Sequence, residues 1–346
     1  MTKYLCKDCW LQHDVDTLLA GCNECATRTR ERLEPLLDRH DPGELARTGV
    51  FTCKLHKEEA LRIFCDTCKQ PVPLGTFGDR SVLAVVGDAL SGKTTLMWVT
   101  TGRMHRSRGN GGLAIQRPIG NSDALLYETI APIFAAGSAP TKRSDADVRN
   151  YAWELKLPHG AEGNWLLAFH DAAGEIWREL ADLSIDRHPA LRRFLALVGS
   201  VMLTIDGDKL LETLDVPVGA MGGAHLRFAE EYELRIVEAL GLRFRPRQAK
   251  VPIAVTVTKA DVLWDMPEWE LFRPDSDATR ASIDRAVQQL LRRTGRGPLL
   301  EMLDKWFAPV SYFAVSAFGS RPYRGFKVED VRSSRVEEPI AALLNV

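Results

Sequence analysis

The clearest pattern in the chain is an alternation of short apolar runs with longer amphipathic stretches, which begins near residue 80. Short apolar runs bounded by turn residues predict strands, and apolar residues repeated every three or four positions predict helices. The runs that predict strands are Val82–Val86, Ala152–Leu157, Trp165–His170, Ser200–Ile205, Ile253–Val257 and Ser311–Val315. The stretches that predict helices include Lys93–Thr101, Ala190–Val198, Phe228–Leu240, Ala278–Arg293 and Glu338–Leu344. This alternation predicts an α/β domain with a largely parallel sheet.

The spacing of these elements also predicts where the chain divides. Lys69–Arg80 contains two Pro and two Gly ahead of an apolar run, which is typical of a linker. We therefore expect residues 1–76 to form a small module and residues 77–346 to form the main domain. Within that domain, Met104–Asn150 and Lys209–Lys250 are long for connections, so we expect lids, insertions or mobile segments there.

A phosphate-binding loop lies between the first predicted strand of the main domain and the helix after it. Gly87, Gly92, Lys93 and Thr94 match the pattern G-x4-G-K-S/T in full. Glycines let backbone N–H groups wrap around phosphate oxygens, and the following helix presents its positive end there. We expect Lys93 to bridge the β- and γ-phosphates and the Thr94 hydroxyl to ligate Mg²⁺. Other loop residues expected to contact the nucleotide are Asp88, Ser91 and Thr95.

A second motif, Asp-Ala-Ala-Gly, follows the predicted strand Trp165–His170. Asp171 at the end of this strand can hold a magnesium-bound water opposite the phosphate loop. The N–H of Gly174, three residues later, can reach a γ-phosphate. Its position after the phosphate loop favours a role in sensing the triphosphate.

Two further strand ends indicate the base. Thr258, Lys259 and Asp261 directly follow a Val-rich run, and the carboxylate of Asp261 can accept hydrogen bonds from N1–H and the 2-amino group of guanine. The stem of Lys259 can pack along the base, and adenine offers no such pair of donors. Ser316 and Ala317 end the last predicted strand, where a backbone N–H can reach the guanine O6. The sequence therefore predicts GTP or GDP as the bound nucleotide.

The order of these motifs, GDALSGKT, DAAG, TKAD and SA, resembles the P-loop GTPases of the TRAFAC class over about residues 82–320. The resemblance implies a three-layer P-loop fold in which Gly87, Lys93 and Thr94 bind phosphates and Mg²⁺. It implies that Asp171 and Gly174 sense the γ-phosphate, and that Lys259 and Asp261 select guanine. Thr258 stands where Asn is commoner, although some branches carry Thr. Asp206 also ends a strand, but in this class that strand flanks the nucleotide, so Asp171 ranks first as the magnesium acid.

The same resemblance implies roles in hydrolysis. The threonine that ligates Mg²⁺ in the GTP-bound state should precede the strand leading to Asp171. Thr141 is the first candidate for this role and Thr129 is the second. Glu175 occupies the place of a water-orienting Gln. A carboxylate beside a triphosphate adds repulsion unless it acts as a base or pairs with a cation. We therefore assign catalysis to Lys93, Gly174 and Glu175 and expect slow hydrolysis that waits on a partner.

The long distances between the motifs point to one branch of this class. Positions 87 and 171 are 84 residues apart, and positions 261 and 316 are 55 apart. With a cysteine-rich module in front, this layout looks most like the double-GTPase branch of bacterial conflict systems. That likeness implies a switch or NTPase acting in antiviral defence beside effector proteins.

The first part of the chain carries four metal-binding knuckles. All seven cysteines precede residue 70, and with one histidine they form four pairs with two-residue spacing. The pairs are Cys6 and Cys9, Cys22 and Cys25, Cys53 and His56, and Cys65 and Cys68. Such spacing turns both side chains of a tight turn toward one ion, and two knuckles complete a tetrahedral zinc site. Eight ligands therefore predict two Zn²⁺ ions with a structural role.

Which knuckles share an ion can be argued from loop length. Pairing in succession leaves 12 and 8 residues between knuckles, so closing each ring costs less entropy. The first ion would then bind the first and second knuckles, and the second ion the third and fourth. A cross-braced arrangement would instead pair the first knuckle with the third. Residues 53–68 resemble half of a B-box zinc finger.

The composition bears on the location and the binding partners of the protein. With 45 basic and 46 acidic residues and 45% hydrophobic residues, the chain has an ordinary core and no overall field toward nucleic acid or an anionic membrane. The opening segment lacks a signal-peptide core, and the apolar runs are too short to span a bilayer. We expect a cytoplasmic location, no membrane association, a protein partner for the zinc module, and nucleic acid to be disfavoured.

These features predict a GTP-binding and hydrolysing switch. A nucleotide-locked scaffold that binds GTP without turnover is the first alternative, and an ATP-using kinase or ATPase is the second. Measuring phosphate release would distinguish the hydrolysing switch from the scaffold. Nucleotide competition would identify the ATP-using enzyme.

Overall fold

The computed structural model describes fifteen stretches of the chain, with gaps between them. They are residues 3–6, 8–14, 19–21, 34–35, 62–69, 71–72, 81–88, 90–107, 113–119, 121–136, 149–157, 165–171, 189–214, 224–244 and 250–344.

A seven-stranded sheet runs through the main domain, in the order β13-β12-β11-β7-β10-β9-β8. Its strands are β7 (Ser81–Gly87), β8 (Ala114–Pro118), β9 (Arg149–Lys156), β10 (Trp165–Asp171), β11 (Val198–Asp206), β12 (Val251–Thr258) and β13 (Phe307–Ala314). The strands from β13 to β10 are parallel, whereas β9 is antiparallel to β10 and β8 is antiparallel to β9. The predicted α/β fold with a mainly parallel sheet is confirmed.

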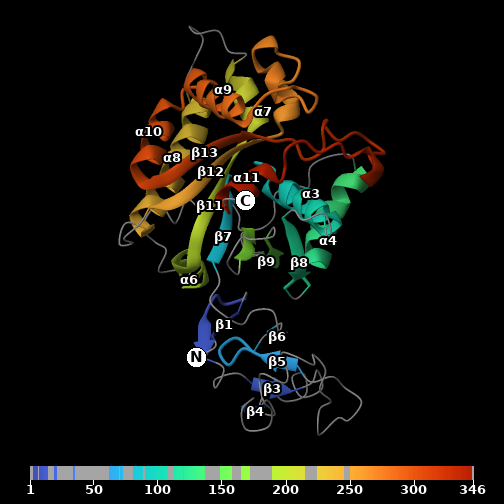
Figure 1. Cartoon of the computed structure of the whole chain (residues 1–346), viewed down its shortest axis with the longest axis vertical. Coiled ribbons are helices and arrows are strands. Elements are labelled where there is room, and N and C mark those ends of the chain that lie inside the picture. The colour runs from blue at the N-terminus through green and yellow to red at the C-terminus, as the bar shows by residue number, and fades with distance from the viewer. Residues whose placement is uncertain are drawn as a thin grey trace.

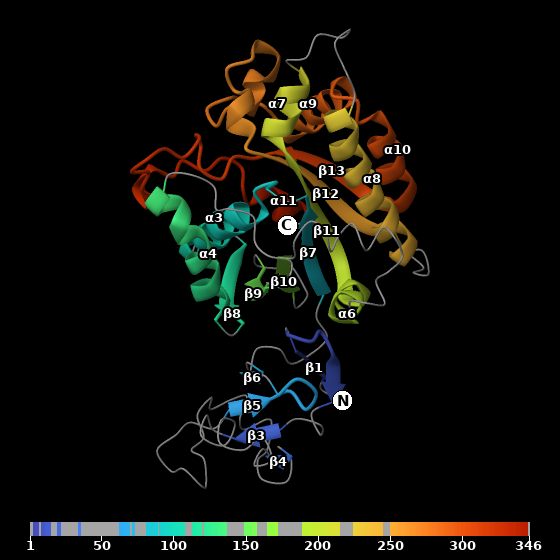
Figure 2. The same ribbon diagram turned by 180° about the vertical axis from the view of Figure 1, so that it is seen from behind.

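Helices cover both faces of this sheet, which gives the domain three layers (Figures 1 and 2). The helices are α3 (Lys93–Arg106), α4 (Ser122–Ala136), α6 (Pro189–Leu197), α7 (Gly207–Leu214), α8 (Ala224–Phe244), α9 (Arg280–Arg293), α10 (Gly297–Trp306) and α11 (Glu338–Leu343). One core lies under α6 to α10, and a second core lies under α3, α4 and α11.

The central strand shows why this sequence needs two helical layers. Side chains of a strand point alternately to opposite faces. Val82, Ala84 and Val86 belong to the first core, while Leu83 and Val85 belong to the second. Because every one of these residues is apolar and buried, both faces of β7 have to be covered.

All six strands predicted from the sequence are present, and the five predicted helices are too, with shifted ends. Residues 104–150, expected to be a lid or an insertion, contain β8 and α4, which extend the sheet by one edge strand and cover it. Residues 209–250 contain most of α7 and all of α8. α10 was not predicted either.

The N-terminal module is built from very short strands. β1 (Lys3–Leu5) pairs with β2 (Gln12–Asp14), and a four-stranded sheet has the order β4-β3-β5-β6. The strands of that sheet are β3 (Leu19–Gly21), β4 (Glu34–Pro35), β5 (Arg62–Phe64) and β6 (Pro71–Val72). Figures 1 and 2 both place these strands at one end of the molecule, next to α6 and away from α7 and α9.

The first knuckle packs directly on the main domain. Trp10 is 1% exposed and belongs to the core under α6, with its ring centroid 4.8 Å from that of Phe194. Arg193 of α6 donates a hydrogen bond to the backbone carbonyl of Cys9 at 2.7 Å. The predicted boundary between residues 76 and 77 lies outside the described residues, so it stays a prediction.

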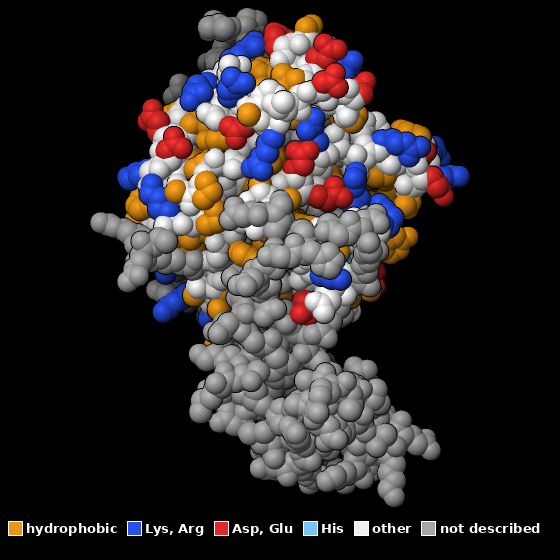
Figure 3. Space-filling model, viewed as in Figure 1, with side chains coloured by type: hydrophobic (Ala, Val, Ile, Leu, Met, Phe, Trp, Pro, Cys, Tyr) orange, Lys and Arg blue, Asp and Glu red, His pale blue; other side chains and the backbone are white. Residues whose placement is uncertain are grey.

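The surface of the described residues carries charges of both signs. On the face seen in Figure 3, Lys and Arg side chains are interspersed with Asp and Glu over the main domain. Within the described ranges, every helix is too short or too polar to cross a membrane.

Candidate nucleotide site and cysteine cluster

The phosphate loop starts where β7 and β11 come unusually close. A Cβ atom on Gly87 would lie 2.2 Å from Thr204 Oγ1 and 2.6 Å from the Thr204 carbonyl oxygen, so only glycine permits this approach. Thr204 Oγ1 donates to the carbonyl of Val86 at 3.1 Å and lies 2.8 Å from Ser91 Oγ. The loop is therefore tied to its neighbouring strand at both ends.

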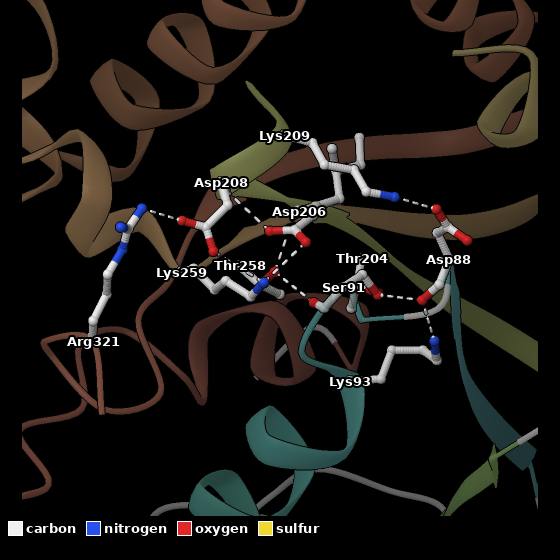
Figure 4. A network of polar contacts seen from close by, with 11 residues as sticks. Asp88, Ser91, Lys93, Thr204, Asp206, Asp208, Lys209, Thr258, Lys259 and Arg321 are labelled. Atoms are coloured by element: carbon white, nitrogen blue, oxygen red, sulfur yellow. Dashed lines mark hydrogen bonds and ion pairs between the residues drawn. The ribbon is translucent and has the colours of Figure 1, made fainter. Parts of the chain in front are cut away.

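Lys93 and Thr94 form the start of α3, directly after this loop. The Lys93 side chain is 6% exposed, and its ammonium donates to the carbonyls of Gly87 at 2.9 Å and Asp88 at 2.6 Å (Figure 4). An ammonium held inside the loop at the positive end of a helix is suited to bind phosphate oxygens. Thr94 is half-buried beside it.

Thr258 links the base motif to the phosphate loop. Its hydroxyl donates to the carbonyl of Ser91 at 2.6 Å, and it also lies 3.1 Å from the carbonyl of Ile205. One side chain therefore joins the ends of β11 and β12 to the loop after β7. Thr258 therefore has a clear structural role.

Asp261 lies close to the end of β12 and is held by a hydrogen bond. Its carboxylate accepts from the hydroxyl of Ser316 at 2.5 Å, and Ser316 in turn accepts from the N–H of Gly319 at 2.8 Å. Burial raises the pKa of Asp261, and the hydrogen bond from Ser316 opposes that rise only in part. Asp261 and Ala317 both line a pocket that adjoins the phosphate loop.

Lys259 lies across this pocket with two carboxylate partners. Its ammonium is 2.9 Å from Asp206 Oδ2 and 3.1 Å from Asp208 Oδ2 (Figure 4). Burial disfavours the charged lysine, but the two carboxylates outweigh that effect and the pKa of Lys259 is raised. Asp206, the competing magnesium acid, is 5% exposed and serves as the partner of Lys259.

A pocket opens between these residues. It has a cavity volume of about 170 Å³. Thr95, Lys259, Asp261, Ala317 and Arg321 are among the residues that line it. The pocket adjoins the phosphate loop, because Gly92 lines it as well.

Part of the predicted site lies outside the described residues. This applies to Thr141, Gly174 and Glu175. Asp171 ends β10, where its backbone lies opposite Arg149 of β9. Thr129, the second candidate for the switch threonine, is buried between α4 and β9, with its hydroxyl 2.9 Å from the Leu125 carbonyl and 3.1 Å from the Tyr151 hydroxyl. That location excludes Thr129 as a magnesium ligand beside the loop.

Three charged residues around the pocket were not predicted to belong to the site. Asp208 and Lys209 lie in the first turn of α7, and Arg321 lies in the segment after β13. Arg321 donates to Asp208 at 2.6 Å, and Lys209 donates to Asp88 at 2.5 Å. The sequence signal that could have found them is the run Asp-Gly-Asp-Lys at the end of a predicted strand, because strand ends gather at the ligand site of a parallel sheet.

Four cysteines of the N-terminal module meet in one cluster. The Sγ atoms of Cys6, Cys9, Cys65 and Cys68 all lie within 4.8 Å of one another. The Cys6–Cys68 and Cys9–Cys65 sulfur atoms are 3.5 Å and 3.7 Å apart. Zinc bound at about 2.3 Å in a tetrahedron requires sulfur separations of roughly 3.8 Å. The donor set and its size therefore fit one Zn²⁺ ion.

This cluster corrects the predicted pairing of knuckles. The first knuckle shares its site with the fourth, so pairing in succession is wrong, and so is the cross-braced pairing of the first with the third. The reason is that β3 pairs with β5, which returns the chain beside its start just before Cys65. Ring closure over the 56 positions between Cys9 and Cys65 adds little entropy cost, since that cost grows slowly with length. The other predicted ligands, Cys22, Cys25, Cys53 and His56, lie outside the described residues, so a second ion stays a prediction.

Comparisons with known proteins give weak likenesses only. No family model matches the chain, and no curated protein matches it. Among solved structures, the chain is similar to one from a signal recognition particle receptor complex of Chaetomium thermophilum, at 12% identity and a TM-score of 0.36, over 70% of this chain and 93% of that chain. It is also similar to a small COPII coat GTPase from Encephalitozoon cuniculi in complex with GDP, at 14% identity and a TM-score of 0.31, over 78% of this chain and 82% of that one.

A third similar structure is translation elongation factor SelB from Methanococcus maripaludis in complex with a GTP analogue. The identity is 17% and the TM-score 0.31, over 78% of this chain but only 35% of that chain. At TM-scores this low, the likenesses say nothing about what this chain does.

The cluster predicts how zinc content responds to substitution. Cys9→Ser and Cys65→Ser remove ligands of the same ion, so each variant should lose one zinc ion per chain relative to wild type. The double variant should also lose one, because no second ion depends on either residue. Elemental analysis of purified protein measures the ratio. A double variant that loses two ions would restore pairing in succession.

The raised pKa of Asp261 predicts a pH-dependent affinity for guanine nucleotides. The ionised carboxylate accepts both base donors, whereas the protonated acid cannot, so affinity should be level above the raised pKa and fall as the pH drops through it. The fall should approach about tenfold per pH unit. Equilibrium titrations with GDP across pH measure it, and Asp261→Asn serves as the control because the nucleotide phosphates titrate identically. Affinity that stays level down to about pH 3.9, the ordinary pKa of aspartate, contradicts the assignment.

Proposed function

We propose that this chain is a GTP-binding and GTP-hydrolysing switch protein. The proposal rests on one observation: the hydrogen bond from Thr258 to the Ser91 carbonyl joins a loop suited to phosphate to the segment that carries Asp261, a half-buried carboxylate suited to guanine. A nucleotide in the adjoining pocket would place its phosphates on the loop and its base on Asp261. The loop alone favours any nucleoside triphosphate, and Asp261 supplies the preference for guanine.

Each residue of the site has a proposed task in binding. Lys93 stabilises the β- and γ-phosphates, and the hydroxyl of Thr94 ligates the magnesium ion that accompanies them. Mg²⁺, when bound, neutralises charge on the phosphates. Asp171 orients a water of that ion from the end of β10. Asp261, held by Ser316, accepts from the base, and Lys259 covers one face of it.

Hydrolysis is assigned to the segment after β10. The N–H of Gly174 binds the γ-phosphate, and Glu175 acts on the attacking water, with Thr141 closing over the magnesium ion. Because a carboxylate is repelled by the triphosphate, turnover by the isolated chain is expected to be slow. Loss of the γ-phosphate would release these segments, which is a change that a partner can sense.

The zinc module is proposed to dock a protein partner, in a bacterial conflict or anti-phage system. The packing of Trp10 and Cys9 on α6 limits which part of the module can do so, since this side of the first knuckle already contacts its own domain. The partner would therefore bind the outer part of the module. The zinc ions would hold the fold and take no part in hydrolysis.

A second candidate function is a GTP-bound scaffold without turnover. Glu175 favours it, because this residue stands where a neutral water-orienting side chain would promote hydrolysis. Release of phosphate in a single turnover, with and without cell extract from the native host, separates the scaffold from the switch.

Changing the base acceptor should change base preference. Asp261→Asn replaces an acceptor of two N–H groups with an amide that can donate to the 2-oxygen of xanthine. We expect GDP affinity to fall by about 100-fold or more and xanthosine diphosphate to become the better ligand, because a site built for particular hydrogen bonds rejects an analogue that leaves them unpaired.

Competition titrations with guanosine, xanthosine and adenosine diphosphates measure this preference. Asp265→Asn is a matched control, since Asp265 is 98% exposed in its side chain and lies outside the guanine pocket. If Asp261→Asn binds GDP as tightly as wild type, the carboxylate does not read the base.

A further inference from the structure

The phosphate loop of this chain contains a carboxylate at a place where negative charge is unfavourable. Asp88 directly follows Gly87, and its backbone carbonyl accepts from the ammonium of Lys93 at 2.6 Å. The carbonyl of Asp88 also accepts from the hydroxyl of Ser91 at 2.9 Å. These backbone contacts place Asp88 in the loop that would surround the phosphates, and its carboxylate is only 15% exposed. Like charges brought together in a half-buried site repel strongly.

The structure supplies a cation for this carboxylate from another element. Lys209, in the first turn of α7, donates to Asp88 Oδ2 at 2.5 Å, and the two side chains are only 34% and 15% exposed (Figure 4). A partly buried ion pair is screened less by solvent and salt than one on the open surface. The charge of Lys209 is therefore felt inside the loop.

Several contacts fix the first turn of α7 in place. A Cβ atom on Gly207 would lie 2.5 Å from the carbonyl oxygen of Thr258, so the turn packs directly against the base motif. Asp206 accepts from the N–H of Asp208 at 3.0 Å, and the hydroxyl of Thr213 donates to the carbonyl of Lys209 at 2.8 Å. The Lys209 backbone is thus held between the two halves of the nucleotide site.

The two neighbouring charges of this turn serve different parts of that site. Asp208 faces the base side, where it pairs with Lys259 and Arg321, whereas Lys209 faces the phosphate loop. Deeper in the domain, burial raises the pKa of Glu233, and the ion pair of Glu233 with Arg296 opposes that rise. The charge of Lys209 lowers the pKa of Glu233, and the charge of Asp88 raises it. The Asp88–Lys209 pair is therefore part of a connected set of charges behind the loop.

We propose that Lys209 is a positioning residue that neutralises Asp88 and so allows the phosphate loop to accept a highly charged nucleotide. This inference rests on the proposed function and deepens it, since it names a residue that sets the preference for tri- over mono- and diphosphates. Each added phosphate brings further negative charge close to the loop, so the cost of an uncompensated Asp88 rises along the series GMP, GDP, GTP.

The experiment uses the full chain with its zinc and compares four proteins. They are wild type, Lys209→Met, Asp88→Asn and the double variant, each titrated calorimetrically with GMP, GDP and GTP in the presence of Mg²⁺. Lys250→Met is the matched control, because it removes the same charge from an exposed side chain. Lys250 lies just before β12, and its ammonium donates to the carbonyl of Asp304 in α10. Thermal unfolding midpoints establish that each variant is folded.

The expected result is a graded loss with a specific rescue. Lys209→Met should weaken GTP binding by about tenfold, GDP by about threefold and GMP by less than twofold, and higher salt should shrink the losses. The double variant should bind GTP within about twofold of wild type, because no carboxylate is left to neutralise. Asp88→Asn keeps the backbone of Asp88, which makes the contacts within the loop, and removes only the charge of its side chain. This variant should therefore bind GTP as well as wild type or better, which gives a test even if Lys209→Met does not fold.

Three outcomes would overturn the proposal. Equal losses for GMP and GTP would mean that Lys209 acts on the fold or on the base. A double variant as weak as Lys209→Met would mean that Lys209 binds phosphate itself. Weakened GTP binding in Asp88→Asn would mean that the carboxylate aids binding. If wild type prefers adenine nucleotides, the proposed guanine preference fails, and the same series with AMP, ADP and ATP still tests the charge pair.

Discussion

The hydrogen bond from the Thr258 hydroxyl to the carbonyl of Ser91 is the contact on which the candidate nucleotide site depends. It joins the end of β12, which Lys259 and Asp261 follow, to the loop after β7, which leads into Lys93. β11 lies between these strands, and Thr204 completes the connection through Ser91 and Val86. The parallel pairing of β7, β11 and β12 sets the spacing of the strand ends, and this link fixes the loop after β7 against the end of β12.

The parallel sheet makes this contact possible. Its central strands are apolar on both faces and are buried by helices on either side, so their ends are held rigidly while the loops that follow carry polar groups. Gly87 and Gly207 lie where neighbouring backbones approach too closely for any side chain. Charge then completes the site: Lys259 is held between Asp206 and Asp208, and Lys209 is held against Asp88.

Local sequence was sufficient for the features that depend on local chemistry. The strands follow from continuous apolar runs such as Val82–Val86, and the phosphate loop follows from a fixed spacing of Gly and Lys. β8 and α4 escaped prediction because β8, Ala-Ile-Gln-Arg-Pro, has too few apolar residues to mark a strand, and α4 carries Pro132 in its interior. An edge strand is specified by its one neighbour more than by its own composition.

Features that depend on contacts between residues distant in sequence could not be predicted from local sequence patterns. The pairing of the first and fourth knuckles arises from strand pairing between β3 and β5, whereas loop length alone favoured the wrong order. Likewise, nothing near Lys209 in the sequence indicates that it pairs with Asp88, which lies 121 positions away. In both cases the tertiary fold brings together residues whose individual signals are weak.

If the pocket at Asp261 binds guanine while the adjoining loop holds the phosphates, the protein should distinguish GTP from ATP. Calorimetric titration of the wild-type protein with each nucleotide in the presence of Mg²⁺, followed by competition between the two, measures this. We expect one GTP bound per chain and no displacement by an equal concentration of ATP. Equal affinity for the two nucleotides, or uptake of neither, would contradict it.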